Sequence, residues 1–157
     1  MRIFPTIAVV SAGLFGCHTQ MQQTATAEDF GLYYSLSATE GAKLVHGRDG
    51  SDALDLLLTC AKGSGKIQLL DFANDGPHLR LVAGKAAEDL TGALKKGDDD
   101  YDWVEVAVTA ASPAMKGFRS TGQIDLTSGS RRIVVAARTP PDLKAVADFF
   151  ADCGTGA

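Results

Sequence analysis

The chain has 157 residues, of which 45% are hydrophobic and 22% charged, with 15 Lys and Arg against 19 Asp and Glu. This length and composition are typical of one globular domain that can bury a core of its own. The net charge of −4 disfavours nucleic acid as a partner, and also electrostatic docking on anionic lipid, because both need a basic surface.

The first sixteen residues have the layout of an export signal. Arg2 is followed by thirteen residues, from Ile3 to Phe15, that carry no charge. This run is shorter than the roughly 20 apolar residues of a membrane-spanning helix, and it matches the apolar region of a secretory signal. An ordinary secretory signal and a buried N-terminal helix are the alternatives.

The end of this run, LFGC at residues 14–17, resembles the lipobox of bacterial lipoproteins. The resemblance implies that the Cys17 sulfur carries diacylglycerol and that a signal peptidase removes residues 1–16. Residues 17–28 are then the lipidated cysteine and a flexible tether, because they are rich in Gln and Thr and contain no Trp, Phe or Leu. We expect a cell-envelope protein anchored by lipid to a membrane facing the periplasm, the outer membrane rather than the inner.

Two cysteines remain if Cys17 is lipidated, Cys60 and Cys153. An even pair in an exported chain is expected to form a disulfide, because the compartment is oxidising. Two separate buried thiols are the alternative. We predict no metal site and no cofactor, since the chain has no Cys-x-x-Cys motif and its three histidines lack ligand spacing.

Residues 29–157 are predicted to form a single β-rich domain. Short segments of alternating apolar and polar residues are separated by Gly, Asp, Asn and Pro, which is the pattern of antiparallel strands. The predicted strands lie at 31–38, 43–47, 53–60, 67–72, 79–84, 102–110, 122–126 and 131–137. The predicted fold class is mainly β, an antiparallel sandwich or barrel-like sheet with one C-terminal α-helix.

The predicted C-terminal helix lies in TPPDLKAVADFFADCG, residues 139–154. Thr139 and Asp142 have the spacing of a capping box, and the prolines fall in the first turn, where no backbone donor is missed. The predicted apolar stripe consists of Leu143, Val146, Phe150 and Cys153. A disulfide from Cys153 to the strand that ends at Cys60 would hold this stripe against the sheet.

Three blocks of the domain resemble a family of small uncharacterised alphaproteobacterial envelope proteins. The blocks are residues 43–69, 118–126 and 147–154. The family pairs a strand ending in Cys-x-x-Gly-Ser-Gly with a terminal Phe-Phe-x-x-Cys-Gly. The resemblance covers Phe30 to Gly154, supports the cysteine pair and implies no known activity.

Two loops carry fragments of ligand-binding motifs without completing them. GSGK at residues 63–66 lacks the first glycine and the final Ser or Thr of a phosphate-binding loop, so we interpret it as a turn. GDDDYDW at residues 97–103 has alternating aspartates but lacks the turn glycine and closing Glu of a calcium loop. We interpret it as an acidic hairpin, with weak calcium binding as the alternative.

The sequence indicates no catalytic residues. It contains neither a Gly-x-Ser-x-Gly nor a His-Glu-x-x-His motif. His46 continues the core-facing side of its strand, so we predict an inward or rim histidine with satisfied hydrogen bonds rather than a catalytic base.

Tyr101, Trp103 and Glu105 form the predicted binding surface. The valines that alternate with them should face the core, which sends these three side chains to the opposite face of the strand. Two aromatic rings beside a carboxylate can stack on a sugar or anchor a partner peptide. The alternative is that the terminal helix or another strand covers this face.

The sequence therefore predicts a lipid-anchored envelope protein that is a non-enzymatic binding or structural module, with an envelope protein or a glycan as its partner. One alternative is an inhibitor of a periplasmic or foreign hydrolase, which rests on architecture only. The other alternative is an envelope hydrolase.

Overall fold

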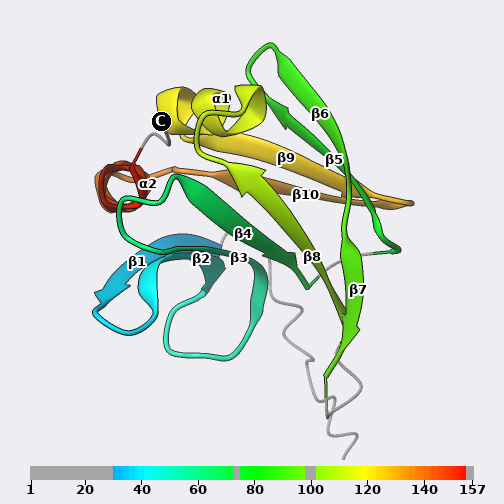
Figure 1. Cartoon of the computed structure of the whole chain (residues 1–157), viewed down its shortest axis with the longest axis horizontal. Coiled ribbons are helices and arrows are strands. Elements are labelled where there is room, and N and C mark those ends of the chain that lie inside the picture. The colour runs from blue at the N-terminus through cyan, green and yellow to red at the C-terminus, as the bar shows by residue number, and fades with distance from the viewer. Residues whose placement is uncertain (1–29, 73–74, 98–101, 155–157) are drawn as a thin grey trace, which may run out of the picture.

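The computed structural model describes residues 30–72, 75–97 and 102–154, which form two antiparallel sheets and two helices (Figure 1). The predicted signal peptide (1–16), Cys17 and the rest of the tether lie outside the described residues. Within the described ranges, no helix is long and apolar enough to cross a membrane.

The first eight elements of the chain are all strands, and the two helices come later, one after β8 and one after β10. The first sheet contains β1 (Phe30–Ser37), β2 (Gly41–Arg48), β3 (Leu54–Cys60), β4 (Lys66–Asp71), β8 (Asp102–Thr109) and β7 (Ala93–Lys96), in that order across the sheet. The second sheet contains β10 (Arg131–Ala136), β9 (Gln123–Ser128), β5 (His78–Ala83) and β6 (Ala86–Thr91), in that order. The helices are α1 (Pro113–Thr121) and α2 (Pro140–Cys153).

The predicted mainly β fold with a C-terminal helix is confirmed, and of the two predicted forms it is the sandwich, because neither sheet closes into a barrel. The chain crosses between the sheets at Gly92, the single residue between β6 and β7. A Cβ atom there would lie 2.5 Å from Val104 Cγ1 and 2.6 Å from Val106 Cγ2. Only glycine therefore lets the chain pass this closely over β8.

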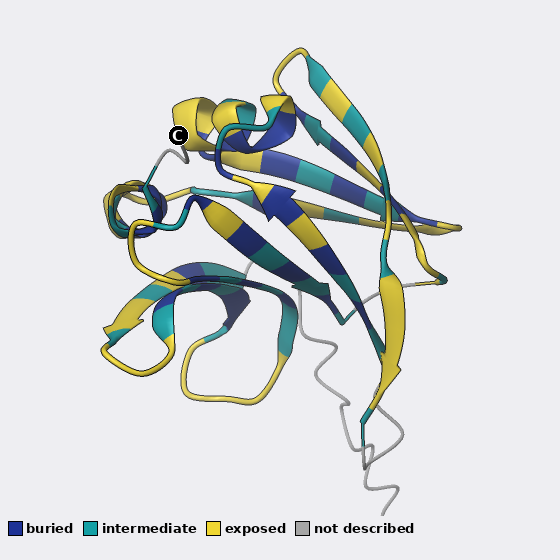
Figure 2. Cartoon of the chain, in the orientation of Figure 1, coloured by how far each residue is buried: buried dark blue, intermediate teal, exposed yellow. Residues whose placement is uncertain are grey.

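The core lies between the two sheets. Leu44, Leu58, Leu69 and Val106 are cross-strand neighbours in one row of the first sheet. Leu81 and Leu126 pair in the same way in the second sheet, and all six side chains are buried. Figure 2 shows the result as buried positions that alternate with more exposed ones along β8 and β9, as expected for strands with one face on the core.

The C-terminal helix α2 packs against β1 and β2 and is capped as predicted (Figure 1). The side chain of Thr139 accepts from the backbone N–H of Asp142, and the Asp142 carboxylate accepts from the backbone N–H of Thr139. Asp142 Oδ1 also accepts from the Leu32 N–H in β1 at 3.1 Å. Burial acts to raise the pKa of Asp142, but these hydrogen bonds outweigh it and hold the pKa below its ordinary value.

The predicted apolar stripe of α2 is wrong at Leu143, which is 52% exposed. Asp142 occupies that part of the interface instead, because its carboxylate binds the β1 backbone. The helix face that packs on the sandwich consists of Asp142, Ala145, Val146, Phe149, Phe150 and Cys153. The hydrogen bonds of Asp142 fix which side of α2 faces the sheets. Phe149 is therefore buried in the core, and Leu143 is exposed.

A second helix, α1, was not predicted. It begins after Ser112, whose hydroxyl accepts from the Met115 N–H, and it ends at Gly122 in a left-handed conformation. Phe118 of α1 meets Phe150 of α2 edge to face, with ring centroids 6.0 Å apart. The two helices therefore contribute aromatic side chains to the same core.

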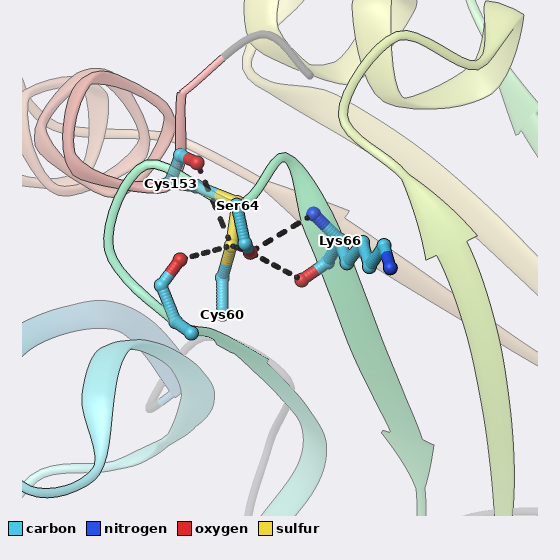
Figure 3. Close-up of a disulfide and its surroundings, with 5 residues drawn as sticks. Cys60, Ser64, Lys66 and Cys153 are labelled. Atoms are coloured by element: carbon cyan, nitrogen blue, oxygen red, sulfur yellow. Dashed lines mark hydrogen bonds between the residues drawn. A yellow bond between two sulfur atoms is a disulfide. The ribbon is translucent and has the colours of Figure 1, made fainter. Parts of the chain in front are cut away.

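The predicted disulfide between Cys60 and Cys153 is confirmed, with Cα atoms 5.5 Å apart (Figure 3). The turn that follows Cys60 also binds the end of α2. The Gly63 N–H donates to the Asp152 carbonyl and the Gly65 N–H to the Cys153 carbonyl, both at 2.8 Å. These bonds satisfy carbonyls that a helix end leaves without partners. The GSGK segment is thus the predicted turn, and it also caps α2.

Tyr34 makes a further link between β1 and the end of α2. Its hydroxyl donates to Asp152 Oδ2, while Lys62 Nζ lies 3.3 Å from Asp152 Oδ1. Burial, together with the neighbouring Asp152 carboxylate, raises the pKa of Tyr34 to about 12. The hydrogen bonds from Tyr34 and Lys62 hold the pKa of Asp152 below its ordinary value. The tyrosine is therefore a neutral structural donor at physiological pH.

Candidate functional site

A cleft of about 550 Å³ lies beside Trp103, the tryptophan predicted from sequence to bind a partner. It is lined by Asp52, Ala53, Leu54, Phe72 and Trp103. Among the described residues the lining is mostly apolar, and Asp52 is the one ionisable residue of that set. This volume lies within the range of small-molecule and side-chain pockets in proteins.

Strand register places Trp103 at this cleft. Val104, Val106 and Val108 are buried, so the residues between them face away from the core. Trp103 pairs with Lys95 of β7, while Phe72 directly follows β4 on the other side of β8. The two aromatic rings lie 6.1 Å apart at an interplanar angle of 34°.

The segment before β3 forms the opposite wall of the cleft. The Phe72 N–H donates to the Asp55 carbonyl at 3.0 Å, which fixes the residue after β4 against the start of β3. Leu54 opens β3 and pairs with Gly47 of β2. The cleft is therefore built from the start of β3, the end of β4 and the start of β8, which strand pairing brings side by side.

The indole N–H of Trp103 is buried and has no hydrogen-bond partner among the described residues. Indole nitrogen is a donor only, so it needs an acceptor, and none of the described residues supplies one. A buried donor without an acceptor costs about 1–3 kcal/mol, and buried tryptophans usually have a partner for it. An acceptor supplied by a bound molecule would remove that cost.

The other two residues of the predicted surface lie in different settings. Glu105 is half-buried on the same face of β8 and accepts a hydrogen bond from the Gln68 side chain of β4, so it is part of the sheet rather than of the cleft lining. Tyr101 lies outside the described residues. The terminal helix α2 packs on β1 and β2, at the other end of the first sheet from β8.

Sequence reasoning missed Phe72 and Leu54, and it also missed an apolar row on the outer face of the first sheet. Tyr33, Val45, Leu57 and Leu70 form a cross-strand row on that face. None of the four is fully buried, and Tyr33 is 39% exposed. The signal for this face was the run of consecutive leucines in β3 and β4, which puts apolar side chains on both sides of the sheet.

His46 is buried and its Nδ1 lies 2.6 Å from Asp55 Oδ1, as expected for an inward histidine with a partner. Across the described ranges, no group of three or more His, Cys, Asp or Glu is placed to hold a metal ion. The 97–103 segment falls largely outside the described residues, so its calcium alternative has no structural description.

The chain matches no protein-family model, no curated protein and no solved structure.

Proposed function

We propose that the protein is a lipid-anchored envelope module that binds a partner protein at the Trp103 cleft and catalyses no reaction. The single observation that carries this proposal is the buried indole N–H without a partner beside an apolar cleft. Such a site suits an apolar side chain whose neighbouring main-chain carbonyl accepts from Trp103 Nε1. Aromatic anchors in apolar pockets dominate the affinity of many protein interfaces.

A protein partner fits this cleft better than a glycan does. A sugar presents many hydroxyl groups, and a glycan site therefore needs several polar side chains around the aromatic ring. Besides the indole N–H, the lining residues that the structure describes offer one polar side chain, the carboxylate of Asp52. The apolar side chains of Leu70, Leu57 and Val45, which form a cross-strand row on the same face, also favour a broad protein surface.

The described part of the cleft lining holds no catalytic pair, which supports a non-enzymatic role. A general acid or base needs a titratable group near the reacting atoms, usually with a second group that activates or orients it. Of the described residues that line the cleft, Asp52 is the one that can titrate. The cleft is therefore suited to binding.

Binding at the cleft is tested by photo-crosslinking in cells. A photoreactive residue in place of Ala53, which lines the cleft, should give one dominant protein adduct in envelope fractions. Trp103→Ala should reduce that adduct by at least about tenfold, since loss of an aromatic anchor costs 2 kcal/mol or more. Crosslinked bands are quantified by immunoblotting and identified by mass spectrometry.

The matched control is Tyr33→Ala, which removes another partly exposed aromatic from the same face but at the far edge of the sheet. It should leave the adduct in place. An adduct of equal intensity in the Trp103→Ala protein would contradict the proposal. Binding of soluble peptidoglycan fragments to the wild-type protein, in the absence of any protein adduct, would assign the cleft to a glycan instead.

The lipid anchor is supported by the lipobox-like residues 14–17 and by the disulfide, which suits an oxidising compartment. Radiolabelled palmitate should enter the wild-type chain. Cys17→Ser should abolish the label and release the protein from the membrane fraction, because one thiol carries the anchor. Equal labelling of the two proteins would contradict the lipoprotein assignment.

A further inference from the structure

A second cleft, of about 390 Å³, lies between the two sheets and is separate from the Trp103 cleft. Phe30, His46 and Asp55 line one side of it, from the first sheet. The other side is lined by Arg132, Ile133 and Val134 of β10, and by Arg138 just before α2. The lining thus combines a histidine, a carboxylate and two guanidinium groups.

A β-bulge brings Asp55 to His46. His46 pairs with Leu56 and Gly47 pairs with Leu54, so Asp55 is an extra residue on β3 with no partner on β2. A bulge of this kind turns a side chain away from its regular alternation, and bulges are common next to functional sites. Here it turns the Asp55 carboxylate to the same side as His46, and the two side chains meet at 2.6 Å.

This contact orients the imidazole of His46. Carboxylate oxygens accept hydrogen bonds, so Asp55 Oδ1 accepts one from the Nδ1–H group of His46. The side chain is about 10% exposed, and Phe30 packs against it with ring centroids 5.6 Å apart. Nε2 has no hydrogen-bond partner among the described residues. The ring is therefore held by its neighbours with one nitrogen left for a ligand.

Two arginines line this cleft, in a chain that is acidic overall. The described lining residues carry two guanidinium groups and one carboxylate, whereas the whole chain has a net charge of −4. Arg132 is ion-paired with Asp125 of β9, which anchors one of its nitrogens while the fork retains further N–H donors. The backbone N–H of Arg138 donates to Asp142 Oδ2 at 3.0 Å, which fixes the main chain of Arg138 just before α2.

We propose that this cleft binds the phosphate group of a phosphomonoester, held between His46 Nε2 and the guanidinium groups of Arg132 and Arg138. Arginine suits phosphate because its planar fork binds two oxygens at once. A phosphomonoester has its second ionisation near pH 6, so it carries both P–O⁻ and P–OH oxygens in the neutral range. It can therefore accept from the arginines and either accept from or donate to Nε2, whereas a carboxylate offers acceptors only.

The test is calorimetric titration of the purified full-length protein. A hexose 6-phosphate and inorganic phosphate are the soluble probes, and the unphosphorylated hexose is the control ligand. Vesicles with phosphatidic acid, a phosphomonoester headgroup, are compared with vesicles of phosphatidylglycerol, a diester. Binding of the soluble probes would support the site with a free phosphate as its source. Binding of phosphatidic acid alone would support it with a lipid headgroup as the source.

Single substitutions locate the site. Arg138→Gln and His46→Gln should each weaken phosphate binding by at least about tenfold, since each removes a charged or oriented hydrogen bond to the ligand. Arg132→Lys, which keeps the charge but loses the fork, should weaken it less. Arg80→Gln is the control, because Arg80 pairs with Asp89 on the outside of the second sheet and does not line this cleft. Trp103→Ala should have no effect, which separates this site from the protein-binding cleft.

Because His46 is buried, circular dichroism first establishes that the His46→Gln protein is folded. Arg138 is exposed, so Arg138→Gln tests phosphate binding without a large effect on folding. Wild-type affinity in both variants would overturn the proposal. It would also be overturned if neither the soluble phosphates nor phosphatidic acid binds the wild-type protein, or if the unphosphorylated hexose and the diester vesicles bind equally well.

Discussion

Replacing Cys153 by Ser should lower the free energy of unfolding by about 2–5 kcal/mol, the usual loss when a small exported domain is deprived of a native disulfide. The bond joins the ends of β3 and α2, which are 93 positions apart. A loop of about 100 residues corresponds to about 4.7 kcal/mol in the chain-entropy model. Guanidinium unfolding of the two proteins, followed by circular dichroism, measures the difference.

The double variant Cys60→Ser and Cys153→Ser is the control for this measurement, because it also removes the free thiol left by the single change. It should be destabilised by a similar amount. Reduction of the wild-type protein should have the same effect without any substitution. Reduced and oxidised wild-type protein with equal unfolding midpoints would contradict the structural role of the bond.

Phe150→Ala should cost about 3–5 kcal/mol, the range for removing a buried aromatic side chain. Phe150 is 1% exposed and contacts Phe118 of α1 and Phe149 of its own helix edge to face, at 6.0 and 5.3 Å. The substitution leaves a cavity where the two helices meet the sheets. Urea unfolding at constant pH gives the loss directly.

Leu143→Ala is the matched control for Phe150→Ala, since it shortens an apolar side chain on the same helix at a position that is 52% exposed. We expect a loss of about 1 kcal/mol or less, because little apolar surface is buried there. Equal losses in the two variants would show that the helix phase described above is wrong.

The elements that were predicted correctly are those whose own residues specify them. The strands of the core alternate in polarity, and α2 carries Thr139 and Asp142 at capping-box spacing. The buried face of α2 was less predictable, because Leu143 is as apolar as the buried residues Val146 and Phe150. What decides the phase is the hydrogen bond from Leu32 of β1 to Asp142, a contact 110 positions away in sequence.

The missed elements depend on contacts that a local pattern does not contain. Helix α1 includes Gly117, which lowers helix propensity by about 1 kcal/mol relative to alanine. The structure explains this glycine, since a Cβ atom there would lie 2.5 Å from the Ala83 carbonyl oxygen of β5. Strand β7 has four residues, all exposed, and its only sequence signal was the glycine before it.

The two clefts were predictable to different degrees. Alternation along β8 was sufficient to place Trp103 away from the core, but Phe72 and Leu54 join it only through the register of β3, β4 and β8. The His46 and Asp55 pair depends on a bulge, which a regular two-residue period cannot reveal. Arg132 and Arg138 come from the opposite sheet and its connection to α2.

Binding of a partner at the Trp103 cleft is tested most directly by the nuclear magnetic resonance signal of its indole N–H. Trp103 is the only tryptophan in the chain, so isotope-labelled protein gives a single indole signal. Titration with the protein captured by the crosslinker at position 53 should shift this signal downfield and slow its exchange with water, because an acceptor then binds Nε1. A complex that forms while the indole signal keeps its position and its exchange rate would contradict the account.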